Sequence, residues 1–143
     1  MPGEMARWCQ SRGTPVPTSE GEFVRTALES LALKYRMVLA WLEELSGSKV
    51  EVIHIVGGGC QNELLNQFTA DACGVPVIAG PIEATALGNV LVQARGSGEL
   101  STLAEMRSVV GASSALRRFE PRERQAWHDA YGRFRELLSL PST

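Results

Sequence analysis

The sequence has few aromatic residues and almost no net charge. Aromatic residues make up 6% of the 143 positions, and 14 Lys and Arg against 16 Asp and Glu leave a formal charge of −2. A chain this close to neutrality has no electrostatic reason to bind nucleic acid or an anionic membrane surface. We therefore expect neither of these partners.

Cysteine is scarce and long hydrophobic runs are missing. Cys9, Cys60 and Cys73 stand far apart and form no CxxC or Cys/His pattern, so neither a disulfide framework nor a zinc site is predicted. Every apolar run is interrupted well before the ~20 residues of a membrane span, and the first residues contain no apolar signal-peptide core. We expect reduced thiols, no membrane-spanning segment and a cytoplasmic location.

What is present is the composition of one globular domain. Apolar residues make up 44% of the chain, and a compact domain of this length buries roughly 70% of its extended surface. Composition alone therefore predicts a single hydrophobic core that needs no disulfide or metal.

The first long helix is predicted between Ser19 and Gly47. Ser19 and Glu22 have the spacing of a capping box, and Gly47 is suited to the left-handed conformation that ends a helix. Apolar residues recur at every third or fourth position, which is typical of a helix with one buried stripe. The residues of this expected stripe are Phe23, Ala27, Leu31, Tyr35, Val38, Leu42 and Leu45.

A β–α–β unit is predicted after this helix. Residues 50–56 are apolar on both alternating faces, which is typical of a central parallel strand covered by helices on both sides. A helix ending at Gly74 and a short strand at residues 75–78 follow. The fold class is therefore α/β.

The last third of the chain is predicted to be helical. One helix covers residues 83–94 and contains Gly88, for which we expect close packing against neighbouring backbone. A second helix is capped at Thr102, and a final helix follows Pro121. The expected buried stripe of the final helix is Trp127, Tyr131, Phe134 and Leu138.

Three glycines between the first strand and its helix are the most informative motif. Glycines at 57–59 permit a tight turn and leave room for a ligand, and the amides of the following helix favour a phosphate. A tight connection without a ligand fits the same spacing. A P-loop is excluded because the chain has no Gly-Lys pair. A dinucleotide fingerprint is disfavoured because Asn62 takes the place of its third glycine.

Three segments together resemble the C-terminal lobe of the FGGY carbohydrate kinases. They are ESLALKYR at residues 29–36, HIVGGGCQNELLNQFTADACG at 54–74 and PVIAGPIEATALGN at 76–89. The resemblance extends over roughly residues 2–122 in unbroken order. It implies part of an actin-like ATPase (ribonuclease H-like) C-terminal lobe, with helices packed on a short, mostly parallel sheet.

The resemblance also implies site residues that bind ATP. Gly57 and Gly58 match the paired glycines of the family's adenosine motif, Gly59 extends the turn, and Asn62 occupies a position that faces the nucleotide. Ala86 and Gly88 match small residues that let their helix approach the nucleotide loop.

The parts of the family that perform phosphoryl transfer are not in this sequence. The resemblance places the catalytic aspartate, the DxGT-like loop that holds Mg²⁺ through a carboxylate, and the sugar pocket upstream of residue 1. It implies a kinase fragment with no catalytic residue of its own. We expect residues 1–18 to lead in from an internal helix of that lobe, 19–123 to form its nucleotide-binding part, and 124–143 to form a helix and tail.

Two other readings stay open from the residues alone. The chain is alternatively a non-catalytic nucleotide-binding or interaction module, or a fragment of a Rossmann-type oxidoreductase, which Asn62 disfavours. Within the kinase interpretation no residue of the chain identifies the substrate, so L-fuculose, xylulose and glycerol kinases of the family stay open as alternatives. If the chain is a partial lobe, some of its apolar surface would pack against the rest of a kinase. We then expect self-association through that surface.

Overall fold

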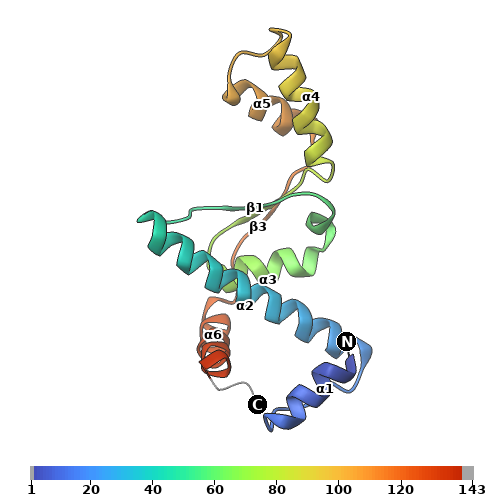
Figure 1. Cartoon of the computed structure of the whole chain (residues 1–143), viewed down its shortest axis with the longest axis vertical. Helices are drawn as coiled ribbons and strands as arrows, with labels where there is room; N and C mark the ends of the chain where they lie inside the picture. Colours follow the sequence, from blue (N-terminus) through green and yellow to red (C-terminus); the bar gives the residue numbers. More distant parts are fainter. Residues whose placement is uncertain (1, 140–143) are drawn as a thin grey trace.

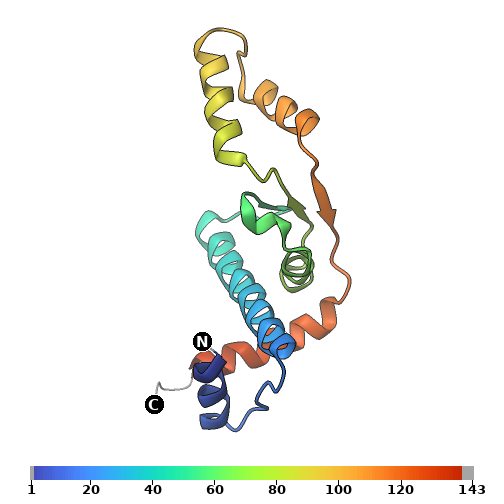
Figure 2. The same cartoon turned by 90° about the vertical axis from the view of Figure 1, so that its right-hand side faces the viewer.

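The computed structural model describes residues 2–139, which form helices at both ends of a small central sheet (Figure 1). The helix pair α4 and α5 extends from one end, and α1 and α6 lie at the other (Figures 1 and 2). The elements in chain order are α1 (Pro2–Ser11), α2 (Glu20–Ser46), β1 (Ile53–Ile55), the 3₁₀ turn η1 (Gly58–Gln61), α3 (Glu63–Cys73), β2 (Val77–Ala79), α4 (Ala84–Gly96), α5 (Leu103–Ser113), β3 (Arg117–Phe119) and α6 (Arg124–Ser139).

The helix boundaries follow from local hydrogen bonding, as the sequence predicts. The Ser19 hydroxyl accepts from the amide of Glu22 at 3.3 Å, and the Glu22 carboxylate accepts from the amide of Thr18 at 2.6 Å. The same carboxylate also accepts from the hydroxyl of Thr18 and the amide of Ser19. The hydrogen bonds from Thr18 and the Ser19 amide to the carboxylate lower the pKa of Glu22. Gly47 ends α2 in the left-handed conformation, with φ of 66°. The capping box predicted at Thr102 is also present at the start of α5.

The sheet is small and mixed, with the strand order β1-β2-β3. The parallel pairing of β1 with β2 through α3 confirms the predicted β–α–β unit. The sheet is mixed rather than mostly parallel because β3, which the sequence analysis missed, pairs with β2 in antiparallel orientation. Arg117 and Arg118 are both exposed, so the strand lacks the apolar alternation by which a sequence pattern would predict it. Within residues 2–139, β1 lies at an edge of the sheet and not at its centre.

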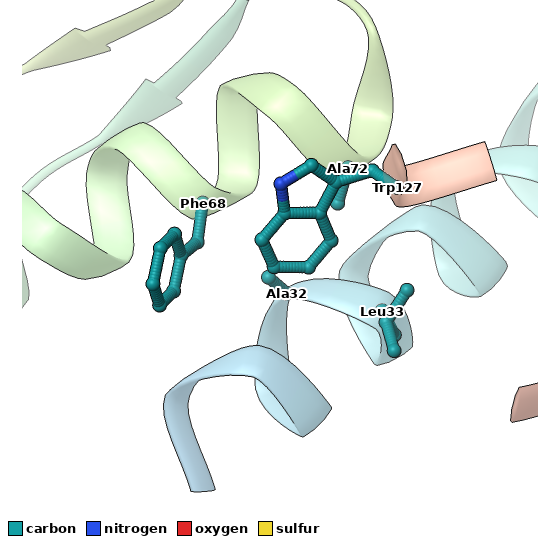
Figure 3. Packing of buried hydrophobic residues seen from close by; sticks show 5 residues of the cluster. All are labelled: Ala32, Leu33, Phe68, Ala72 and Trp127. Atoms are coloured by element: carbon teal, nitrogen blue, oxygen red, sulfur yellow. The ribbon is translucent and has the colours of Figure 1, made fainter. Parts of the chain in front are cut away.

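Two hydrophobic clusters hold α3 in place. In the first, the indole of Trp127 from α6 lies between α2 and α3 (Figure 3). Its ring centroid is 5.2 Å from that of Phe68 at an interplanar angle of 53°, a favourable tilted aromatic arrangement. The full set of buried residues in this cluster is Ala32, Leu33, Phe68, Ala72 and Trp127. A second cluster lies between α3 and the sheet and comprises Cys60, Ala70, Val77, Ala79 and Phe119.

The buried face of α2 differs from the predicted stripe. Ala32, Leu33 and Met37 are buried, whereas five of the seven residues expected to be buried are exposed, with Leu45 at 85%. The helix carries apolar residues on two faces, and α3 and α6 pack on the face where the small Ala32 permits close approach. The opposite face, with Tyr35, borders a groove of about 600 Å³ beside β1.

The chain exposes more surface than a compact monomer. Its accessible area is 9622 Å², about a third more than the ~7,200 Å² expected for a folded monomer of 15.5 kDa. The single self-sufficient core predicted from composition is therefore not what the chain forms. The exposed apolar residues do not make a membrane span, since no helix within residues 2–139 is long and apolar enough to cross a bilayer.

The small residues of α4 do not pack as predicted. Ala86 is exposed, and a Cβ added at Gly88 would meet no atom within 4 Å outside its own helix and neighbours. The reason is that α4 extends away from the sheet and not across the glycine turn (Figure 2).

Replacing Trp127 with alanine should strongly lower the free energy of unfolding. Truncating a buried aromatic residue leaves a cavity and typically costs 3–5 kcal/mol, or about 4 kcal/mol here. Urea denaturation of W127A measures the loss. Trp41 is 51% exposed, so W41A serves as the matched control and should cost less than about 1 kcal/mol. Equal losses in the two variants would show that the α2–α3–α6 cluster does not hold the fold.

Candidate nucleotide-binding site

The glycine turn lies where the carboxyl ends of β1 and β2 meet. β1 ends at Ile55, and its carbonyl accepts from the amide of Gly80 at 2.8 Å. The amide of Gly57 in turn donates to the carbonyl of Pro81 at 3.0 Å. These two bonds fix the start of the turn against the segment that follows β2. Ligands of open α/β sheets bind at this edge, outside the carboxyl ends of the strands.

The three glycines have different physical reasons to be glycine. Gly57 has φ of 76° and ψ of −165°, a region that other residues almost never occupy. Gly58 and Gly59 are exposed and have no positive φ, and a Cβ added to either would meet nothing within 4 Å. The fold itself therefore requires glycine at 57 only. At 58 and 59 the missing side chains leave open space against the backbone, as a ligand lying on the turn would need.

Asn62 connects the turn to α3. Its side-chain Oδ1 accepts from the amide of Leu65 at 3.0 Å and so caps the helix. The residue is exposed, and its Nδ2 is the side-chain atom that can donate to a ligand. The structure thus brings Gly57, Gly58, Gly59 and Asn62 together in one turn. The contact of Asn62 with a nucleotide stays a prediction.

The charge at the start of α3 is partly balanced. The helix N-terminus favours an anion, whereas Glu63 in its first turn adds a negative charge. The guanidinium of Arg117 on β3 forms an ion pair with the Glu63 carboxylate. The hydrogen bond from the Arg117 guanidinium to this carboxylate, together with the positive charge of Arg117, lowers the pKa of Glu63. Strand β3 therefore reduces the repulsion that Glu63 would exert on a phosphate.

Other residues with chemical potential do not join the turn. His54 on β1 is exposed and borders the groove beside α2. His128 on α6 hydrogen-bonds through Nδ1 with Nη2 of Arg36 at 3.0 Å. The Cys60 side chain is buried in the cluster under the turn, so it is not an exposed thiol at a helix end. Among the described residues no group of three or more His, Cys, Asp or Glu side chains is placed to hold a metal ion.

Sequence reasoning missed two residues that shape the turn. Pro81 accepts from Gly57 through its carbonyl, a backbone bond that leaves no signature in residue type. Asn66 is fully buried on α3, and its Nδ2 donates to the carbonyl of Cys60 at 2.8 Å. A polar amide on the apolar face of a predicted helix was the available signal for Asn66.

The chain belongs to the FGGY family of carbohydrate kinases. Residues 2–97 match the C-terminal domain of that family. The chain is 47% identical over 131 residues to a rhamnulokinase of Bacteroides thetaiotaomicron, covering 92% of this chain and 27% of that protein. It is 49% identical over 121 residues to a rhamnulokinase of Klebsiella pneumoniae, covering 85% of this chain and 25% of the relative. A rhamnulokinase of Pectobacterium atrosepticum is 42% identical over 136 residues, covering 95% and 27%.

A solved structure supports the fold. The xylulose kinase of Rhodospirillum rubrum superposes with a TM-score of 0.67 and 22% identity, covering 89% of this chain and 26% of that one. The α/β fold with helices on a small sheet is therefore that of an FGGY kinase. The chain spans about a quarter of the length of the curated relatives that it matches.

The two kinds of glycine predict a clear difference in stability. G57A places a Cβ in a backbone region that costs of order 1–3 kcal/mol for a non-glycine residue. G58A meets open space, so its free energy of unfolding should equal or slightly exceed that of the parent chain. Thermal denaturation of both variants tests this. A G58A variant as unstable as G57A would show that the fold, and not a ligand, requires glycine at 58.

Proposed function

We propose that this chain forms the adenosine-side wall of the ATP site in an L-rhamnulose kinase. The parent activity would transfer the γ-phosphoryl group of ATP to the 1-hydroxyl of L-rhamnulose, giving ADP and L-rhamnulose 1-phosphate in L-rhamnose catabolism. The observation that carries the choice of sugar is 42–49% identity to rhamnulokinases over 85–95% of the chain. The xylulose kinase structure, at 22% identity, supports the fold alone.

The glycine turn supports the assignment of a nucleotide to this edge of the sheet. Gly57 gives the turn its shape, and the open space at Gly58 and Gly59 lets a nucleotide approach the backbone. The N-terminus of α3 adjoins the turn and is a favourable place for phosphate oxygens, and Asn62 Nδ2 can donate to the ligand. Phosphoryl transfer depends mainly on such positioning and on charge stabilisation.

Other parts of the kinase must come from outside these 143 residues. The sequence contains no DxGT loop, and its two aspartates are Asp71, which is buried in α3, and Asp129 on α6. We propose that Mg²⁺, the catalytic base and the sugar pocket belong to the remaining three quarters of the kinase. ATP and ADP are then the ligands of this chain, and the cytoplasm is its location.

The chain should bind ATP weakly and at the glycine turn. Titration of the ¹⁵N-labelled chain with ATP should shift the amides of Gly57 to Asn62, with an affinity weaker than micromolar because half of the site is missing. G58A should fold normally and bind several-fold more weakly, since its Cβ occupies the space left for the ligand. G132A adds a methyl group on the distant α6, also into open space, and should bind like the parent chain. Submicromolar affinity, or equal binding by G58A, would contradict the proposal.

The chain should complete a rhamnulokinase but not act as one. In a coupled ADP assay with L-rhamnulose, the isolated chain should give no turnover above its G58D variant, because it has no catalytic base. A chimera that joins the first three quarters of the Bacteroides thetaiotaomicron rhamnulokinase to this chain should phosphorylate L-rhamnulose, and G58D should abolish that activity.

The matched control is a chimera built in the same way on the Rhodospirillum rubrum xylulose kinase. Because identity there is 22%, the lobe surfaces should not match and D-xylulose turnover should be lost. An inactive rhamnulokinase chimera that is correctly folded would refute the assignment.

A further inference from the structure

We propose that Asn66 is a positioning residue that holds the glycine turn in the shape that binds the nucleotide. Asn66 lies one helical turn after the cap residue Asn62, and its side chain is 0% exposed. The inference rests on the proposed function of the turn, since it names the residue that keeps that site in order.

The geometry joins α3 to the centre of the turn. Asn66 Nδ2 donates to the carbonyl of Cys60 at 2.8 Å. Within the turn, the amide of Cys60 donates to the carbonyl of Gly57 at 3.1 Å, and the amide of Asn62 donates to Gly59 at 3.2 Å. Each of these two bonds joins residues that are three apart within the turn. The bond from Asn66 is shorter, fully buried and anchored on α3, so it ties the turn to a helix that packs against α2, α6 and the sheet.

The oxygen of the Asn66 side-chain amide shows that placing this residue here has an energetic cost. Asn66 Oδ1 is buried and has no hydrogen-bond partner in the described part of the chain. Leaving a buried acceptor unsatisfied is unfavourable, and leucine, which has the same branched skeleton of heavy atoms, would not carry that penalty. A residue that only filled space between α3 and the turn would be better apolar. The donor atom at Nδ2 is the property that leucine cannot supply.

The turn needs such an external tie because its own structure is weak. A 3₁₀ turn has poorer hydrogen-bond geometry than an α-helix, and glycine loses more backbone entropy on ordering than any other residue. A turn with three consecutive glycines would pay that entropy when the nucleotide binds. Because Asn66 orders the turn when the chain folds, the entropy cost is met before the nucleotide binds. Preorganisation of this kind raises the affinity for the ligand.

The test compares N66L and N66A with a matched control on the same helix. Thr69 is also buried, at 1% exposure, but its hydroxyl donates to the carbonyl of Leu65 within α3. T69V therefore removes a buried polar group without touching the turn. Hydrogen exchange of the Cys60 and Asn62 amides should accelerate about tenfold in N66L and N66A, the effect of losing one buried hydrogen bond. ATP affinity should fall by a similar factor, and T69V should change neither quantity.

Each outcome decides the proposal. Exchange at Cys60 and Asn62 that stays at the parent rate in N66L, or that rises equally in T69V, would overturn it. If the parent chain binds no ATP while exchange still accelerates in N66L, the nucleotide assignment fails and the tie between Asn66 and the turn stands. If the Asn66 variants do not fold, a scalar coupling across the hydrogen bond, from Asn66 Nδ2 to the Cys60 carbonyl carbon, tests the bond in the parent chain. Its absence refutes the proposal and its presence supports it.

Discussion

Burial of α3 is the constraint on which the rest of this structure depends. One side of α3 packs against α2 and α6 through Phe68 and Ala72, and another packs on the sheet through Ala70. The glycine turn ends at Asn62, which caps the N-terminus of the helix, and the helix ends at Gly74, from which the chain enters β2. Because α3 is packed on both sides, each end of the helix has a fixed position. The end of the glycine turn that joins α3 is therefore fixed as well.

Different residues give the turn its backbone conformation, its open space and its support. Gly57 supplies the unusual backbone angles, and Gly58 and Gly59 supply open space. Support comes from the backbone bond to Pro81 on one side and from the Asn66 side chain on the other. The exposed part of the turn is therefore glycine, whereas one of its two anchors, Asn66, is fully buried. If a ligand lies on the turn, this arrangement gives it access to a backbone that is held in place.

The large exposed surface of the chain is consistent with its place in the FGGY family. A lobe that spans about a quarter of its relatives leaves apolar faces uncovered, among them the side of α2 that borders the groove beside β1. The sequence pattern identified Leu31, Tyr35 and Val38 as a buried stripe, and in residues 2–139 they are exposed. The periodicity was real, but periodicity shows that a face is apolar and not which neighbour covers it.

Sequence by itself determined the features that depend on residues close along the chain. The capping boxes of α2 and α5 and the glycine that ends α2 are governed by hydrogen bonds between residues at most four apart, so a local sequence pattern is enough to predict them. The positions of Gly57, Gly58, Gly59 and Asn62 in one turn belong to the same category.

Only the tertiary structure decided which face of α2 is buried, that Arg117 lies on an antiparallel strand beside Glu63, and that Asn66 reaches under the turn. These outcomes depend on which distant segments meet, and α2 offers two apolar faces of similar character. Packing selects between them through the close approach that Ala32 allows, a choice that no local pattern encodes.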